Sequence, residues 1–267
     1  MGWIEALILG IVQGLTEFLP VSSSGHLEIG KIILGVNAEK SLTYTVVVHG
    51  ATVMSTIVVF WRDLLNLFKG LFAFKWNEET KYIVKLIVSM IPVVIIGFTF
   101  AEEIESLFTG NLLLVGSMLI VTALMLTFSY YAKQKDKEIS YIDSFVIGVA
   151  QAFAVIPGIS RSGSTISTGL LLKNKRDGIA RFSFLMVLVP IIGANVKDLL
   201  DGKLTDNGGV GSTALIVGFL AAFISGLIAC KWMIGIVKKG KLIYFAIYCF
   251  IIGIAAVSYY LFFNNGI

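Results

Sequence analysis

Apolar residues dominate this chain in long runs that are separated by short polar segments. Six runs have about 18 to 21 residues each, which is the length that an α-helix needs to cross a bilayer. They cover residues 44–61, 82–101, 111–131, 181–199, 212–232 and 243–263. The pattern predicts an all-α integral membrane protein with six transmembrane helices, folded as a single membrane domain over residues 1–267.

Two further segments, 1–35 and 141–172, are apolar in part but contain residues that interrupt helices. The interruptions are Gly14, Pro20, Gly25, Pro157, Gly158 and Gly163. At membrane depth, polar and irregular backbone is tolerated only where it is buried in protein or lines a wet cavity. We therefore expect each segment to form a re-entrant helical hairpin, which enters the membrane and returns to the same side.

The two interrupted segments share a pattern, because residues of the first recur 138 positions later in the second. The matching residues are Gly10, Gln13, Ser22, Ser24 and Gly25 in the first, and Gly148, Gln151, Ser160, Ser162 and Gly163 in the second. Similarly, the segment 62–65 is echoed by 197–200. The chain thus reads as two copies of one unit, a hairpin followed by three spans, over residues 1–131 and 141–263.

An odd number of spans in the first copy makes the second copy enter the membrane from the opposite side. This is an inverted-topology repeat, in which the functional site is expected where the interrupted segments meet near the midplane.

Loop charge predicts the orientation of the chain. The loops at 62–81, 132–140, 173–181 and 231–241 hold fifteen Lys and Arg residues, whereas those at 31–43, 102–110 and 197–211 hold four. Basic loops stay in the cytoplasm. Both termini are therefore expected outside, with the first hairpin open to the exterior and the second to the cytoplasm.

Composition supports the membrane assignment and limits the function. In this chain 57% of residues are hydrophobic and 14% are charged. In a typical soluble domain about half of the residues are apolar and about a quarter are charged. The net charge of +4 is weak evidence for an anionic partner. No Walker, Rossmann or zinc-spacing pattern occurs, so we expect membrane lipids as partners and no nucleic acid. Cys230 and Cys249 lie in apolar runs and are expected to be free thiols.

The first hairpin carries several groups that are able to do chemistry. Glu17 follows Gln13 by four residues, so both share a face of a helix. A carboxylate at this depth is a metal ligand, a proton acceptor or the structural partner of a helix end. The turn Ser22-Ser23-Ser24-Gly25 suits phosphate oxygens, although serines are also ordinary N-caps. His26 titrates near neutrality and suits acid–base work.

The second hairpin supplies a cation. Arg161 takes the place that Ser23 has in the first copy, and an arginine at depth in a hydroxyl-rich turn needs an anion to face, either Glu17 or a phosphate. Its turn also holds Ser160, Ser162, Gly163 and Thr165 as candidate phosphate-binding residues. Together the two turns offer a carboxylate, a nucleophile, an acid–base group and a clamp, which is a set suited to phosphoryl transfer. We interpret His49, in an apolar span, as a helix-packing residue with a backbone partner.

The motifs QGLTEFLPVSSSGH and PGISRSGST resemble the two signature regions of the undecaprenyl-pyrophosphate phosphatase family, the bacitracin-resistance type of integral membrane phosphatase. The resemblance extends over essentially the whole chain in length, motif order and hydropathy. It implies an enzyme of the bacterial cytoplasmic membrane that removes the terminal phosphate of undecaprenyl diphosphate and so recycles this polyprenyl carrier lipid for cell-wall synthesis. The site is expected to face the exterior.

The family resemblance also implies residue roles and a cofactor. It assigns catalytic roles to Glu17, Ser23, His26 and Arg161, and a divalent cation, Mg²⁺ or Ca²⁺, as cofactor. Many members have glutamate where this chain has Gln13. Because an amide oxygen binds such ions less tightly than a carboxylate, metal binding by Gln13 is in doubt and Glu17 is the main expected ligand.

Several alternatives remain open from the sequence. The nucleophile is Ser23 activated by His26, or His26 itself, or a metal-bound water. A lipid-phosphate flippase, alone or combined with the phosphatase, is the rival function, because inverted repeats with paired hairpins are typical of transporters. A non-catalytic lipid-binding scaffold would leave Glu17 and Arg161 unexplained. The oligomeric state is open, with a homodimer as one option.

Overall fold

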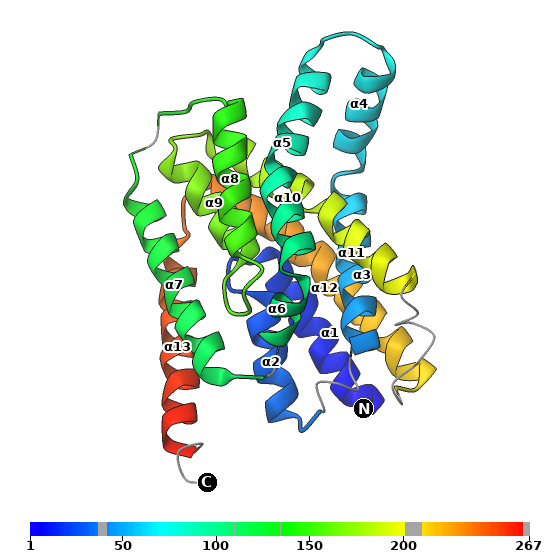
Figure 1. Cartoon of the computed structure of the whole chain (residues 1–267), viewed down its shortest axis with the longest axis vertical. Helices are drawn as coiled ribbons and strands as arrows, with labels where there is room; N and C mark the ends of the chain where they lie inside the picture. The colour runs from blue at the N-terminus through cyan, green and yellow to red at the C-terminus, as the bar shows by residue number, and fades with distance from the viewer. Residues whose placement is uncertain (37–41, 109, 134, 201–209, 264–267) are drawn as a thin grey trace.

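The computed structural model describes residues 1–267 apart from 37–41, 109, 134, 201–209 and 264–267, and apart from the side chains of 42, 197–200 and 263. Its described part is helical, without strands (Figure 1). The helices are α1 (Trp3–Phe18), α2 (Ser23–Ile33), α3 (Leu42–Val59), α4 (Trp61–Phe72), α5 (Glu78–Thr99), α6 (Ala101–Ser106), α7 (Leu112–Tyr131), α8 (Tyr141–Phe153), α9 (Arg161–Leu171), α10 (Arg176–Met186), α11 (Leu188–Leu200), α12 (Ser212–Lys238) and α13 (Ile243–Phe263).

Five stretches of helix are long and apolar enough to cross a membrane, namely α5, α7, α10 continued by α11, α12 and α13. A sixth is added when α3 and α4 are counted as one span with a bend of 73°. These six correspond in order to the six predicted spans. The chain is therefore all-helical, with five to six helices capable of spanning a membrane.

Two predicted loops are partly helical. The helix α4 lies within the predicted loop 62–81, and α10 begins five residues before the predicted span at 181. Both segments carry charged residues, which ended the apolar runs in the sequence. Some of these charges pair between the two helices, since Nη2 of Arg181 on α10 lies 2.8 Å from Oδ1 of Asp63 on α4. The echo at 197–200 lies outside the residues whose side chains are described.

Close helix contacts hold the two short hairpins in place. The helix α1 packs along α12, where a Cβ on Gly10 would lie 2.6 Å from the carbonyl oxygen of Gly218. The helix α8 packs along α5 in the same manner, where a Cβ on Gly148 would lie 2.3 Å from the carbonyl oxygen of Ser89. Small residues at these positions let the backbones approach as closely as helix packing in membranes requires.

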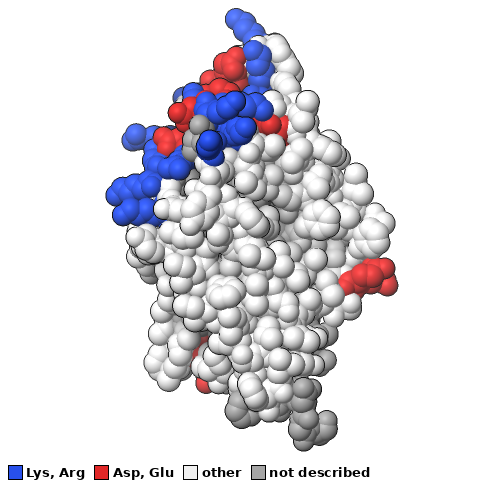
Figure 2. All heavy atoms as spheres, turned by 90° about the vertical axis from the view of Figure 1, so that its left-hand side faces the viewer, with Lys and Arg blue, Asp and Glu red and all other residues white. Residues whose placement is uncertain are grey.

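Charge is distributed unevenly over the surface. Figure 2 shows Lys and Arg gathered at one end of the molecule and a broad uncharged region across the middle. At the basic end, the Lys137 ammonium lies 2.8 Å from the Asp143 carboxylate, and Asn174 Nδ2 donates to the same carboxylate at 3.1 Å. These contacts tie two basic loops to the start of α8. The uncharged middle is the part that matches a bilayer interior.

Candidate active site

The first turn connects α1 to α2 through a strained residue. Ser22 has φ +70°, which is uncommon for a residue with a side chain. Its hydroxyl accepts a hydrogen bond from the Gly25 amide at 3.2 Å and so caps α2. The cap leaves Ser23 as the first helical residue, beside the last turn of α1.

The second turn connects α8 to α9 with a similar cap. The Ser160 hydroxyl accepts from the Gly163 amide at 3.0 Å, and the Ser160 amide donates to Thr122 of α7 at 3.0 Å. Gly158 has φ +96°, and a Cβ there would lie 2.5 Å from the Val115 carbonyl oxygen of α7. Only glycine fits both constraints. Arg161 is consequently the first residue of α9.

The two turns touch each other. The Ser162 hydroxyl donates to the carbonyl of Leu19 at 3.2 Å. A Cβ on Gly25 would lie 3.2 Å from the Cα of Gly158, and one on Gly163 would lie 3.4 Å from Pro20 Cβ. Segments about 140 residues apart in the chain thus meet, and the N-termini of α2 and α9 lie at one place.

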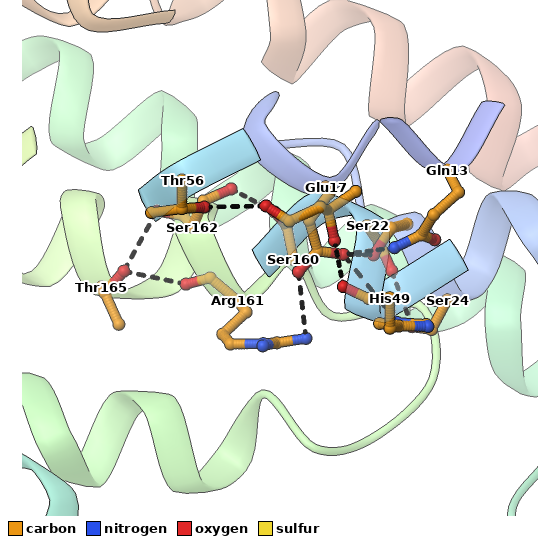
Figure 3. A network of polar contacts seen from close by, with 12 residues as sticks. Gln13, Glu17, Ser22, Ser24, His49, Thr56, Ser160, Arg161, Ser162 and Thr165 are labelled. Atoms are coloured by element: carbon orange, nitrogen blue, oxygen red, sulfur yellow. Dashed lines mark hydrogen bonds and ion pairs between the residues drawn. The ribbon is translucent and has the colours of Figure 1, made fainter. Parts of the chain in front are cut away.

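Glu17 is at the centre of the polar cluster between the turns (Figure 3). Its Oε2 accepts from Ser23 Oγ at 2.6 Å and from Gln13 Nε2 at 2.9 Å. Its Oε1 lies 3.4 Å from Nη2 of Arg161. The Glu17 side chain is 9% exposed, so it needs these partners to remain ionised. The sequence-predicted group of Glu17, Ser23 and Arg161 is therefore one cluster in space.

A cavity opens beside this cluster. Its polar lining comes from Glu17, Arg161, Thr52, Thr56, Ser162, Thr165 and Ser183. Its apolar lining comes from Phe18, Val53, Phe184, Val187, Leu188 and Ile191. Polar and apolar residues share the same helices, as Glu17 and Phe18 do on α1 and Ser183 and Phe184 do on α10. Val187, Leu188 and Ile191 add an apolar wall. This combination suits a ligand with an anionic head and an apolar body.

His26 faces away from Ser23. Its Nδ1 lies 2.8 Å from the Ser22 carbonyl oxygen, and its Nε2 lies 2.8 Å from the hydroxyl of Tyr248. The ring also stacks on Tyr248 of α13, with centroids 5.5 Å apart. Both ring nitrogens are therefore engaged elsewhere, and the proton of the Ser23 hydroxyl is directed at Glu17 instead.

The other predicted phosphate-binding residues have mixed surroundings. Ser22 and Ser160 are N-caps, and each lies near the serine two positions on, with oxygens 3.3 Å apart for Ser24 and 3.4 Å for Ser162. The Thr165 hydroxyl bonds Ser183 of α10, and Ser162 and Thr165 line the cavity. Gly25 and Gly163 lie at the contact between the turns.

Three residues near the cluster were not predicted as site residues. His49 Nε2 lies 3.9 Å from Oε2 of Glu17, although its other nitrogen has the expected backbone partner, the Thr45 carbonyl. Ser183 lines the cavity, and Tyr248 holds His26. Each belongs to a span distant in sequence, and the only signal was a polar group inside an apolar run.

The acidic and sulfur-bearing groups do not make a complete cation centre. No group of three or more His, Cys, Asp and Glu residues gathers within the part of the chain that the structure describes. One feature fits a cation: Oε1 of Gln13 is fully buried and has no hydrogen-bond partner. Glu17 and Gln13 therefore offer a carboxylate and an amide oxygen, which suits an ion that keeps water or phosphate as its other ligands.

Comparison with known proteins supports a single family. The family model described as bacitracin resistance protein BacA matches residues 6–255. A relative named undecaprenyl-diphosphatase in Bacteroides fragilis is 56% identical over 263 residues, which cover 96% of this chain and 98% of that protein. Proteins of the same name are 56% identical in Parabacteroides distasonis, over 97% of this chain and 98% of the relative, and 38% identical in Methanobrevibacter smithii, over 95% and 96%. The chain belongs to the BacA family of multi-pass membrane proteins.

Proposed function

We propose that this chain is an undecaprenyl-diphosphatase, which hydrolyses the terminal phosphate of a polyprenyl diphosphate to leave the lipid monophosphate and thereby confers bacitracin resistance. The name of its relatives supports the activity. The observation that carries the proposal is the 2.6 Å hydrogen bond from Ser23 to Glu17 beside Arg161, at the polar end of a cavity with an apolar wall.

Ser23 is the proposed nucleophile. Its Oγ attacks the terminal phosphorus while Glu17 Oε2 accepts the hydroxyl proton. The bond from phosphorus to the bridging oxygen breaks, and the lipid monophosphate leaves. Glu17 passes this first proton to the departing lipid phosphate. Water then attacks the phosphoserine and gives a proton to Glu17, the bond from phosphorus to Ser23 Oγ breaks, and Glu17 returns the proton to Oγ as inorganic phosphate leaves. In this scheme Glu17, rather than His26, is the base that activates Ser23, and His26 holds the turn through Ser22.

Groups on both hairpins neutralise the negative charge of the phosphate. Arg161 faces the site, and the N-termini of α2 and α9 direct their helix dipoles to the same place. These groups stabilise the negative charge on the equatorial phosphate oxygens. A divalent cation held by Glu17 and Gln13 would supply further positive charge when bound. The apolar wall at Val187, Leu188 and Ile191 suits the first part of the prenyl chain.

The arrangement in the membrane is part of the proposal. We take α1–α2 and α8–α9 as re-entrant hairpins of an inverted repeat, because α1 packs on α12 as α8 packs on α5. The basic end belongs in the cytoplasm of a bacterial cytoplasmic membrane, with both termini outside and the site facing the exterior. Glu17 and His26 have Val155 and Ser164 as repeat counterparts, so the catalytic groups are on one side only.

Phosphate release from undecaprenyl diphosphate by the purified protein tests the activity. Ser23→Ala and Glu17→Gln are each expected to lower the rate by about 100-fold or more, whereas the exposed Ser106→Ala should leave it unchanged. No release from folded wild type would refute the phosphatase. Activity retained in Ser23→Ala would refute the serine nucleophile, and a phosphoenzyme mapped to His26 would reassign it. Lipid uptake into sealed vesicles without phosphate release would instead support a flippase.

A further inference from the structure

His49 has one ring nitrogen fixed and the other free to bind a ligand. Its Nδ1 lies 2.8 Å from the carbonyl oxygen of Thr45, in the preceding turn of α3. A carbonyl accepts hydrogen bonds, so Nδ1 carries the hydrogen of the neutral ring. The tautomer therefore leaves a lone pair on Nε2. A backbone contact on one nitrogen and an open lone pair on the other is the usual state of a metal-binding histidine.

The open nitrogen faces the carboxylate of Glu17. Nε2 of His49 and Oε2 of Glu17 are 3.9 Å apart, too far for a hydrogen bond. Oε2 already accepts hydrogen bonds from Ser23 and Gln13, so a cation between the two atoms would take the place of the Gln13 hydrogen bond. Two atoms that each bind an ion at about 2.1 Å are about 3.0 to 3.4 Å apart at octahedral or tetrahedral angles. A shift of about 0.5 Å between the two side chains would therefore let them share one cation.

Gln13 offers a third donor at the same carboxylate. Its Nε2 donates to Glu17 Oε2 at 2.9 Å, and its Oε1 is buried without a partner. Half a turn of the amide group would exchange the two atoms and place the oxygen beside Glu17. That orientation brings two acceptors together, and a cation between them would make it favourable.

We propose that His49 binds the divalent cation of this site through Nε2, together with Glu17 and Gln13. The inference rests on the proposed function and adds a nitrogen ligand to its cation. A nitrogen donor favours first-row transition ions, for which imidazole is a good ligand, over Ca²⁺, which takes oxygen ligands. The chain therefore selects Mn²⁺, Co²⁺ or Zn²⁺ over Ca²⁺, a preference that the carboxylate and amide alone would not give.

Pulsed electron paramagnetic resonance of bound Mn²⁺ tests the ligand directly and needs no turnover. The chain has only two histidines, His26 and His49, so a tag without histidine makes the signal assignable. Wild type is expected to show imidazole nitrogen coupling to Mn²⁺ that changes when the histidines carry nitrogen-15. The coupling should persist in His26→Gln and disappear in His49→Gln. Bound Mn²⁺ without this coupling, or coupling that survives in His49→Gln, would overturn the inference.

Affinities measured by competition against Mn²⁺ give a second readout. His49→Gln should weaken Mn²⁺ binding by about tenfold or more and change Ca²⁺ binding much less. An equal loss for both ions would overturn the proposed selectivity. Phosphate release by the same samples separates the two proposals. Release with Mn²⁺ that lacks nitrogen coupling would refute only the His49 ligand, whereas nitrogen coupling without release would refute only the phosphatase.

Discussion

Glu17 shows how one buried charge organises its surroundings. Its carboxylate has partners from its own helix and from two other hairpin elements, namely Gln13, Ser23 and Arg161. A sequence reveals such a residue, because an ionisable group at membrane depth is rare and needs a reason. It does not reveal which distant helix faces it. The apolar run around His49 predicts a packing residue with a backbone partner, which Thr45 provides, but it does not predict that Nε2 lies 3.9 Å from Glu17.

Replacing Gln13 by glutamate tests the cation site at the level of single residues. In Gln13→Glu, two carboxylates lie side by side, so their repulsion should lower the melting temperature in chelator. Mg²⁺ should restore it, because two carboxylates bind the ion more tightly than one with an amide. Thermal unfolding in detergent with and without Mg²⁺ measures this difference.

The repeat provides the control for this prediction. Gln151, the counterpart of Gln13, is buried with both amide atoms unpartnered. In the second repeat, Val155 takes the position that Glu17 has in the first repeat. Gln151→Glu should therefore lower the melting temperature with no recovery in Mg²⁺. A shift on adding Mg²⁺ no larger in Gln13→Glu than in wild type would contradict a cation at Glu17.

At the level of elements, the site depends on how closely α1 lies against α12. The helix α1 carries both Gln13 and Glu17, and its glycines let it approach the partner backbone. The sequence predicted that residues 1–35 would form an interrupted hairpin, because proline and glycine break the apolar run. It could not predict the partner of the hairpin, since every apolar span presents similar surfaces.

Gly14→Ala tests this close approach. The added Cβ would lie 2.0 Å from the Ser225 hydroxyl oxygen and 2.4 Å from the Ala222 carbonyl oxygen, so the helices must separate. We expect a loss of stability of about 1 to 3 kcal/mol and a lower phosphatase rate, because Glu17 moves with α1. Gly235→Ala, on α12 with open space at the new atom, should change neither. Normal melting temperature and rate in Gly14→Ala would contradict the packing.

At the level of the whole molecule, most of the fold followed from run length and the site from polar residues inside apolar runs. Five of the six predicted spans correspond to helices able to cross a membrane, and the first corresponds only when α3 is counted with the bent helix α4. The two interrupted segments meet through Ser162 and Leu19. The contacts between helices that are distant in the chain could not be predicted from the sequence. Most of the helix α4 lies in the predicted loop 62–81. The role of His26 as the base of Ser23 stays a prediction, and the two ring nitrogens of His26 lie 2.8 Å from the Ser22 carbonyl oxygen and the Tyr248 hydroxyl.

Orientation in the membrane is the prediction that links fold and function at this scale. Cys230 and Cys249 are buried, so single introduced cysteines will dominate labelling by a membrane-impermeant maleimide. Glu102→Cys, on α6, should react in intact cells, whereas Lys75→Cys and Lys135→Cys should react only after permeabilisation. The reason is that the basic end stays in the cytoplasm. If the labelling pattern is reversed, the first hairpin and the site of lipid dephosphorylation face the cytoplasm, and the predicted orientation is wrong.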